Sequence, residues 1–145
     1  MKIILASDHG GFELKEIIKD YLSKSYDIED LGTYNSDSVD YPDYGIKAGE
    51  AVANGIANFA IIFCGTGIGI SIAANKVPGI RAALCHNVEY AKLSRQHNDA
   101  NVLALGGRFL NPQTAKNIVD AWLNTDFEGE RHQKRINKIN VYERK

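Results

Sequence analysis

One stretch, FAIIFCGTGIGISIAAN at residues 59–75, constrains the fold of this chain more than any other part of its sequence. It begins with an apolar, partly β-branched run, passes through Cys64 into a segment where every second residue is glycine, and becomes apolar again at Ile70. This order predicts a buried strand, a tight loop and the start of a helix. Alternate glycines permit positive φ angles and leave backbone N–H groups free to point into a concavity. We therefore predict a loop that receives an anion or a developing oxyanion.

Cys64 stands at the mouth of this loop. The N–H groups and the following helix N-terminus favour the thiolate, which is the reactive form of cysteine. The alternative is a structural cysteine buried beside a tight turn, since free cysteines are among the most buried residue types. The residues taken alone leave both interpretations open.

The glycine spacing argues against two common nucleotide sites. A dinucleotide-binding loop follows the pattern G-x-G-x-x-G, whereas Ile70 occupies the position of the last glycine here. A P-loop ends in Gly-Lys-Ser or Gly-Lys-Thr, and the chain contains neither triplet. NAD and ATP are therefore both disfavoured.

Length, charge and cysteine usage bound the class of protein. The chain has 145 residues and a net charge of −1, which suits one domain over residues 1–145 without a general attraction to nucleic acid or to a membrane surface. Cys64 and Cys85 form no C-x-x-C pair, and the four histidines are scattered, so we expect no disulfide framework and no metal site. The apolar runs are too short for a signal peptide or a membrane helix. The expected setting is the cytoplasm.

Strand and helix patterns alternate along the chain. We predict strands at residues 3–6, 28–31, 59–63, 81–85 and 101–105. We predict one helix that starts after Gly11, helices at 44–53, 88–97 and 112–123, a helix that starts at 70, and a basic helical tail from Glu130. This alternation predicts an α/β fold in which a five-stranded parallel sheet is covered on both faces. We take the strand order 2-1-3-4-5, a common order of doubly wound sheets.

In that order the first and third strands are neighbours, and ligands bind beyond their carboxyl ends. Asp8 and His9 follow the first strand, so they should lie beside Cys64 and the glycine loop. Each has an ordinary alternative: Asp8 would cap the following helix, His9 would be a surface histidine, and Thr66 in the loop would be a simple turn residue.

Two basic residues of the tail, Arg131 and Arg135, are spaced four apart. They therefore share one face of a helix and can together hold a phosphate dianion. The alternative is a solvated basic face, since Lys134 and Lys138 are close in sequence.

His97 closes a predicted helix that leaves the carboxyl edge of the sheet near Val88 and runs back toward the other edge, about 15 Å away at 1.5 Å per residue. It should not reach Cys64 of its own chain. If both residues serve one site, a second subunit must supply His97, which predicts an obligate dimer with shared sites. The alternative is that His97 and Asn98 merely end the helix.

Six segments carry a resemblance to a known family: SDHGG (7–11), YP (41–42), CGTGIGISIAANK (64–76), GIRAA (79–83), LSRQHNDANVLALGGR (93–108) and GERHQKR (129–135). In this order, over nearly the whole chain, they are similar to type B ribose-5-phosphate isomerase. The resemblance implies a Rossmann-like three-layer α/β/α sandwich that works as a homodimer or a dimer of dimers. It also implies interconversion of ribose 5-phosphate and ribulose 5-phosphate in the pentose phosphate pathway, without metal or organic cofactor.

The resemblance also implies roles for single residues. Cys64 resembles the base that moves a proton between C1 and C2, His97 the acid/base that opens the furanose ring, and Thr66 the relay between O1 and O2. The remaining positions resemble substrate contacts: Gly65, Gly67, Ile68 and Gly69, with Thr66, as the enediolate anion hole; Asp8 at the sugar hydroxyls; His9, Arg131 and Arg135 at the phosphate; and Asn98 and Arg108 completing the set.

Three alternative functions remain open. The first is an isomerase of another phosphosugar, allose 6-phosphate or galactose 6-phosphate, although galactose 6-phosphate isomerase subunits tend to lack some of His9, Cys64 and His97. The second is a non-catalytic phosphosugar-binding module. The third is a hydrolase with Cys64 as nucleophile, which would need a base beside the thiol.

Overall fold

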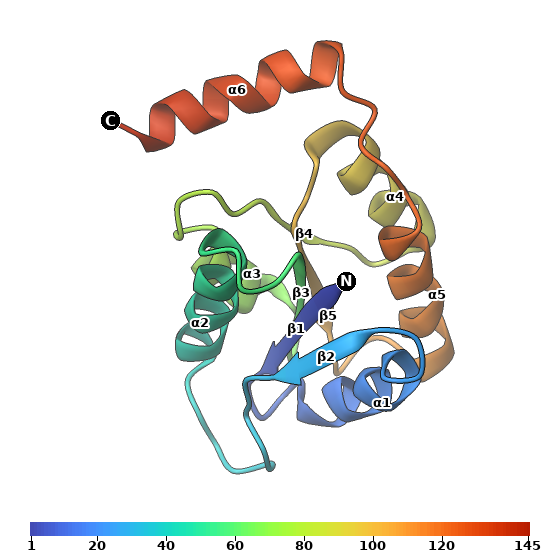
Figure 1. Ribbon diagram of the computed structural model, residues 1–145. Helices are drawn as coiled ribbons and strands as arrows, with labels where there is room; N and C mark the ends of the chain where they lie inside the picture. Colours follow the sequence, from blue (N-terminus) through green and yellow to red (C-terminus); the bar gives the residue numbers. More distant parts are fainter.

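A five-stranded parallel sheet forms the middle layer of the computed structural model, which describes residues 1–145 (Figure 1). Its strands are β1 (Lys2–Ser7), β2 (Asp27–Asp30), β3 (Phe59–Cys64), β4 (Ala82–Leu84) and β5 (Val102–Gly106). The spatial order is β2-β1-β3-β5-β4, and every neighbouring pair is parallel. The α/β class and the five-stranded sheet predicted from the sequence are confirmed.

Helices cover both faces of this sheet. They are α1 (Phe12–Leu22), α2 (Tyr41–Ala53), α3 (Ile68–Ala74), α4 (Val88–Asn98), α5 (Pro112–Leu123) and α6 (Arg131–Glu143). Figure 1 shows α2 and α3 on one face and α1, α4 and α5 on the other, while α6 stands apart from both layers. None of these helices has both the length and the apolar character needed to span a bilayer.

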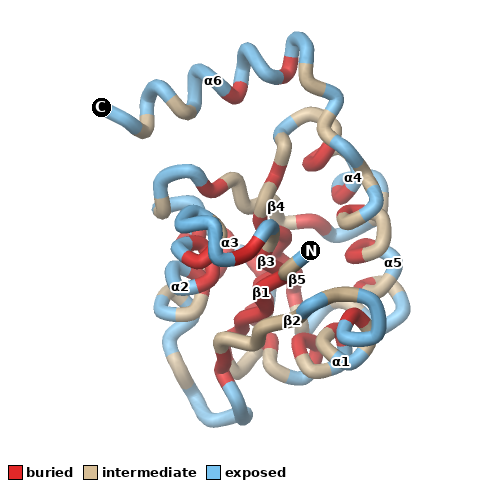
Figure 2. Tube along the Cα trace, viewed as in Figure 1, coloured by how far each residue is buried: buried red, intermediate tan, exposed pale blue.

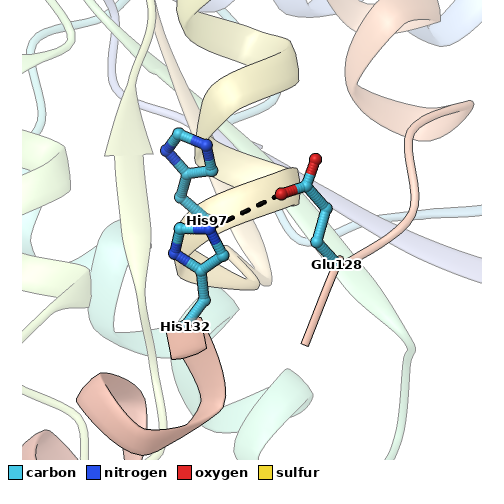
Figure 3. Close-up of side chains that lie close together, drawn as sticks. All are labelled: His97, Glu128 and His132. Atoms are coloured by element: carbon cyan, nitrogen blue, oxygen red, sulfur yellow. Dashed lines mark ion pairs between the residues drawn. The ribbon is translucent and has the colours of Figure 1, made fainter. Parts of the chain in front are cut away.

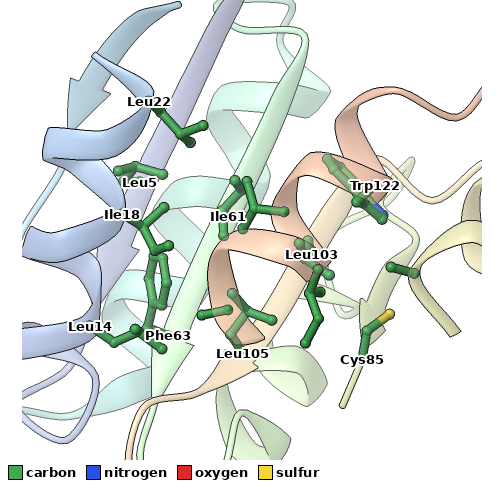
Figure 4. Close-up of a cluster of buried hydrophobic side chains, with 14 of the residues drawn as sticks. Leu5, Leu14, Ile18, Leu22, Ile61, Phe63, Cys85, Leu103, Leu105 and Trp122 are labelled. Carbon is green, nitrogen blue, oxygen red and sulfur yellow. The ribbon is translucent and has the colours of Figure 1, made fainter. Parts of the chain in front are cut away.

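Two apolar clusters, one on each face, hold the layers together. Alternate residues of the central strands point to opposite faces, so Ile61 and Phe63 join the cluster under α1, α4 and α5 (Figure 4), whereas Ile62 and Cys64 join the cluster under α2 and α3. Burial of each such large side chain contributes roughly 1.5–3 kcal/mol. The buried residues run along the centre of the sheet (Figure 2). Cys64 therefore points toward the α2–α3 layer.

The predicted strand order 2-1-3-4-5 is wrong at its end, because β4 and β5 exchange places. All five residues of β5 are buried, as a strand with neighbours on both sides requires, whereas the three residues of β4 are only half-buried. A short strand is well suited to a sheet edge, where it leaves few backbone groups unpaired. The contact between β1 and β3 is unaffected, and β5 becomes the second neighbour of β3.

Some helix boundaries also differ from the prediction. α2 begins at Tyr41 rather than Tyr44, because Pro42 suits the first turn of a helix, where its missing N–H needs no partner. α3 begins inside the glycine loop, at Ile68. The basic C-terminal helix is confirmed as α6, of which only His132 and Ile136 are buried.

Candidate active site

The loop from Cys64 to Gly69, named here the cradle, joins β3 to α3. Gly67 has a φ of +80°, and a Cβ built on it would lie 2.6 Å from Leu84 Cδ1 and 2.9 Å from the carbonyl carbon of Leu105. A side chain is therefore excluded there both by conformation and by space. This conformation directs the Gly67 N–H to Cys64 Sγ at 3.1 Å, and the Ile68 N–H donates to Thr66 Oγ1 at 3.1 Å.

Two further N–H groups of the cradle, those of Gly65 and Thr66, donate to no other group of the chain. Gly65 is half-buried and Thr66 is exposed, so both can meet a ligand. Unpaired donors beside a buried sulfur form a place where negative charge would be stabilised. The predicted order of a strand, a tight glycine loop and a helix is confirmed, while its role as an anion-receiving loop stays a prediction.

The two cysteines lie in different surroundings. Cys64 is 5% exposed at the end of β3, and its sulfur accepts a backbone hydrogen bond. Cys85 is 1% exposed in the opposite apolar cluster, and burial raises the pKa of its thiol to about 11, although Ser94 acts in the other direction. Both thiols are buried, but Cys85 lies in an apolar core, whereas Cys64 lies next to the backbone N–H groups of the cradle.

The loop after β1 lies directly against the cradle. The Asp8 N–H donates to the Phe63 carbonyl at 3.2 Å, and a Cβ built on Gly10 would lie 2.9 Å from the Gly65 nitrogen. The predicted meeting of the Asp8–His9 loop with the cradle is confirmed. Asp8, 7% exposed, also accepts the Gly11 N–H through Oδ1 at 3.1 Å, which holds the turn before α1, although the N-cap residue of α1 is Gly11 rather than Asp8.

His9 is fixed from one side by the loop that precedes α2. Its Nδ1 accepts the Val39 N–H at 3.1 Å. In the neutral ring this bond assigns the proton to Nε2, which is then free to donate to a ligand. His9 is half-buried, consistent with a ring that presents one nitrogen to the site.

The corrected place of β5 brings the segment after it to the cradle. The Gly107 N–H donates to the Cys64 carbonyl at 2.8 Å, and the Arg108 N–H donates to the Gly65 carbonyl at 3.0 Å. The Arg108 guanidinium lies over Gly65, since a Cβ there would be 2.9 Å from Nη1. Arg108, predicted as a site residue, is therefore placed at the cradle.

Tyr41 lies against the cradle, although the sequence reasoning did not name it as a candidate site residue. Its ring lies against Gly69, because a Cβ on that glycine would be 2.7 Å from Cε1, and the side chain is 42% exposed. The available signal was the Tyr41-Pro42 pair among the segments that carry the resemblance. The aromatic ring closes one side of the cradle.

Four predicted residues do not join this group: His97, Asn98, Arg131 and Arg135. Arg81, which precedes β4, donates to the carbonyls of Asn98 and Asp99, so the end of α4 lies at the amino edge of the sheet. Cys64 lies at the carboxyl edge, about 17 Å away over the length of β3 at about 3.3 Å per residue. The structure thus agrees with the argument that His97 does not reach the sulfur of its own chain.

His97 instead meets His132 of α6 and Glu128, a group named here the His97 end (Figure 3). The two imidazole rings stack with centroids 4.3 Å apart and planes inclined by 13°. Burial, with the nearby charge of Arg131, lowers the pKa of His132, while Glu128 acts in the opposite direction. The fold therefore brings together two of the four scattered histidines, which are 35 positions apart in the sequence.

Comparison with known proteins agrees with this arrangement. The model of the family described as Ribose/Galactose Isomerase matches residues 3–139. Ribose-5-phosphate isomerase B of Escherichia coli (strain K12) is 48% identical over 145 residues, covering 99% of this chain and 97% of that protein. A putative sugar phosphate isomerase of Bacillus subtilis (strain 168) is also 48% identical, over 100% of this chain and 99% of its own length.

Solved structures match over the same length. Ribose-5-phosphate isomerase B of Clostridium thermocellum superposes with a TM-score of 0.98 at 54% identity, covering 99% of this chain and 98% of that one. The Mycoplasma genitalium enzyme of the same name, solved with bound ribulose-5-phosphate, gives a TM-score of 0.94 at 44% identity, covering 99% and 97%.

Proposed function

Since the chain belongs to the ribose/galactose isomerase family, we propose that it interconverts D-ribose 5-phosphate and D-ribulose 5-phosphate, as a type B ribose-5-phosphate isomerase. The relative from Mycoplasma genitalium with bound ribulose-5-phosphate supports the choice of substrate. The observation that carries the proposal is the cradle, where the sulfur of Cys64 lies among backbone donors. The setting we propose is the non-oxidative pentose phosphate pathway in the cytoplasm.

Cys64 acts as the base in this proposal. A proton on C2 of the open-chain aldose is weakly acidic, so its removal requires that the enediolate be stabilised as it forms. The thiolate takes the C2 proton, the electron pair moves through C1 to O1, and the N–H groups of Gly65 and Thr66 receive the charge on oxygen. Such donors typically contribute about 3–4 kcal/mol each. Return of the proton to C1 gives the ketose.

Other side chains at the cradle complete the chemistry. Thr66, whose hydroxyl is exposed at the loop, relays the proton between O1 and O2. Asp8 holds sugar hydroxyls beside the cradle, and Arg108 contacts the substrate from its position over Gly65. Each of these groups orients the reacting carbons, which converts binding energy into rate.

A second copy of the chain supplies the rest of the site. In a homodimer, or a dimer of dimers, His97 of one copy opens the furanose ring above Cys64 of the other, with Asn98 contacting the sugar. His9 of one copy and Arg131 and Arg135 of the other hold the phosphate. The two arginines are exposed on α6, four residues apart, which leaves them free to meet another chain.

Exposed apolar side chains surround the cradle, as such an interface requires. Ile68 and Ile72 on α3 are 50% and 56% exposed, and Phe109, next to Arg108, is 75% exposed. Large apolar residues gathered around a site mark a surface that another protein covers. Their position supports a partner copy that closes the cradle from outside.

The function is tested by coupled turnover of ribose 5-phosphate, allose 6-phosphate and galactose 6-phosphate side by side. We expect the pentose to give the highest kcat/KM, and Cys64→Ala to lose about 10²–10⁴-fold while it still folds, because proton transfer by a positioned group contributes that much. Unchanged turnover in Cys64→Ala would refute the role of the sulfur. A higher kcat/KM for a hexose phosphate would reassign the substrate.

The shared site is tested by mixing two inactive variants, Cys64→Ala and His97→Asn, after unfolding and refolding together. Half of the dimers are then mixed, and each mixed dimer holds one site with both native residues, so activity should return to about a quarter of the wild-type value. Recovery of no activity would show that both residues serve a site within one chain, and wild-type activity of His97→Asn by itself would show that His97 has no role.

A further inference from the structure

Three side chains with metal-binding atoms meet at the His97 end. The proposed proton transfer gives a role to only one of the three, His97. One ligand atom from each of His97, Glu128 and His132 lies within 4.8 Å of the others. Two imidazoles and a carboxylate are donors that suit Zn²⁺ and related dications. Neither Glu128 nor His132 has a role in the isomerisation described above.

His132 is the observation that points to a ligand. The residue is 5% exposed, yet its Nε2 has no hydrogen-bond partner in the chain. The nearest acceptor, Oε1 of Glu128, lies 3.5 Å away and forms an ion pair only if the ring is protonated (Figure 3). Buried polar atoms are satisfied in the great majority of proteins, so an orphaned ring nitrogen directed at a carboxylate calls for a reason.

The backbone holds the three groups in place. The Glu128 N–H donates to the Gln96 carbonyl at 3.1 Å, which ties the segment before α6 to the last turn of α4. Gly129 and Glu130 both have positive φ angles, 72° and 53°, and turn the chain sharply into α6. The His132 N–H then donates to the Gly129 carbonyl at 3.0 Å. The cluster is therefore built by the fold and does not depend on flexible side chains alone.

We propose that His97, Glu128 and His132 bind a transition-metal dication, with Zn²⁺ as the representative ion. Ligand atoms about 2.0–2.1 Å from a tetrahedral zinc are about 3.3 Å from one another, so the cluster must contract by about 1.5 Å. The side chain of Glu128 is 47% exposed and can make much of this movement. Arg131 and Arg135, whose charges reach His132, oppose a cation and weaken the site, while the Glu128 carboxylate offsets them.

A bound ion would inhibit the enzyme, a consequence that rests on the proposed role of His97. A ring nitrogen that coordinates a metal cannot take up or release the proton needed for ring opening. The site would thus make isomerase activity sensitive to free zinc. The binding itself does not depend on the isomerase proposal.

Binding is tested on the full chain without sugar, by calorimetric titration with Zn²⁺ and by the absorption spectrum with Co²⁺. We expect one ion per chain in the wild type, an affinity at least about tenfold lower in Glu128→Gln and in His132→Asn, and no thiolate-to-cobalt charge-transfer band. His86→Asn removes an exposed histidine outside the cluster and should bind as the wild type does. Equal affinity in all four proteins, or a thiolate band, would overturn the site.

Inhibition is tested with Glu128→Gln, because Glu128 has no part in the proposed chemistry. Without zinc this variant should turn over ribose 5-phosphate as the wild type does, and it should need at least about tenfold more zinc for half-inhibition. Equal sensitivity of Glu128→Gln and wild type to zinc would overturn the inhibitory role of the ion. The calorimetric titration tests separately whether the ion binds at the His97 end. Loss of isomerase activity in the wild type without zinc would count against the proposed function alone.

Discussion

The cradle and the His97 end are built by different means. Backbone groups make the cradle: the loops after β1, β3 and β5 are joined by main-chain hydrogen bonds, and glycines let them approach within contact distance. At the His97 end, backbone hydrogen bonds fix the turn into α6, but side chains form the group itself, and α6 contributes only two buried residues and stands apart from the layers (Figure 1). The first region is complete within one chain. The His97 end carries arginines on α6 that are exposed to solvent and therefore free to contact another chain.

This difference is the one that the proposed sharing of a site between two copies requires. Main-chain donors fixed by neighbouring strands are preorganised and need no partner to take their positions. Long side chains on a sparsely packed helix can be ordered by whatever they contact. The predictions below test whether the two regions are unequal in this way, beginning with the largest expected effect.

Gly67→Ala should damage the cradle most. The new Cβ would require a residue with φ of +80° and would lie 2.6 Å from Leu84 Cδ1, so the loop must move and its donors with it. We expect kcat/KM for ribose 5-phosphate to fall about 10²–10³-fold, the cost of losing one oxyanion donor. Gly55→Ala is the matched control, because Gly55 has a φ of +77° but nothing within 4 Å. Equal losses in both variants would mean that backbone strain, and not the cradle, explains the effect.

Asp30→Asn should show that the cradle edge is braced within its own chain. Asp30 Oδ2 pairs with the fully buried Lys15 at 2.6 Å, and Oδ1 accepts the Gly32 N–H at 2.9 Å, whose carbonyl in turn accepts the N–H of Ser7. Removing the carboxylate leaves the buried Lys15 ammonium with the more exposed Glu16, at 3.1 Å, as its remaining charged partner. We expect about 3 kcal/mol lower free energy of unfolding at pH 7, measured with urea.

The same pair predicts a pH dependence. Burial alone would raise the pKa of Asp30, but hydrogen bonds from Lys15, the Gly32 N–H and Lys19 outweigh it, so the pKa in the folded protein is below 3.8. The unfolded chain therefore binds the proton more readily, and the stabilisation is complete above about pH 3.8 and is lost as the pH falls through the folded value. The difference in the free energy of unfolding between wild type and Asp30→Asn should therefore shrink to zero as the pH falls through that range. Glu29→Gln, on an exposed ion pair with Lys2, should cost less than about 1 kcal/mol.

Of the variants Gly67→Ala, Asp30→Asn and Arg135→Ala, the last should have the smallest effect, and that effect should be on KM alone. Arg135 is exposed on α6 and is proposed to hold the phosphate of a substrate in the other copy's cradle. Loss of one charge-assisted contact should raise KM about tenfold with little change in kcat. Lys138→Ala, one turn further along the exposed helix, should leave KM unchanged. A fall in kcat with KM unchanged would contradict a role in phosphate binding.

The pattern of neighbouring residues was sufficient to predict those parts of the fold that depend on neighbouring residues. The apolar run before Cys64 and the alternating glycines predicted the strand and cradle, because strand periodicity and the glycine requirement at positive φ are properties of neighbouring residues. The β1–β3 contact followed from a general rule for parallel sheets, and it placed Asp8 and His9 correctly. The separation of His97 from Cys64 of its own chain followed from the rise of a helix.

The sequence predictions that failed concerned contacts between residues far apart in the chain. The order of β4 and β5 depends on which strand can be buried on both sides, and that competition is decided over the whole sheet, as the full burial of Val102–Gly106 shows. The ring of Tyr41 over Gly69 required the start of α2 to be known in space.

The sequence by itself determined an α/β chain with a glycine cradle that follows Cys64 and a histidine too distant to reach that cysteine, because each follows from residues close together or from the dimensions of regular structure. Only the tertiary structure decided that β5 lies beside β3 and that His97, Glu128 and His132 meet. The reason is physical: contacts between residues 30 or more positions apart are selected by the packing of whole elements, which no local pattern encodes.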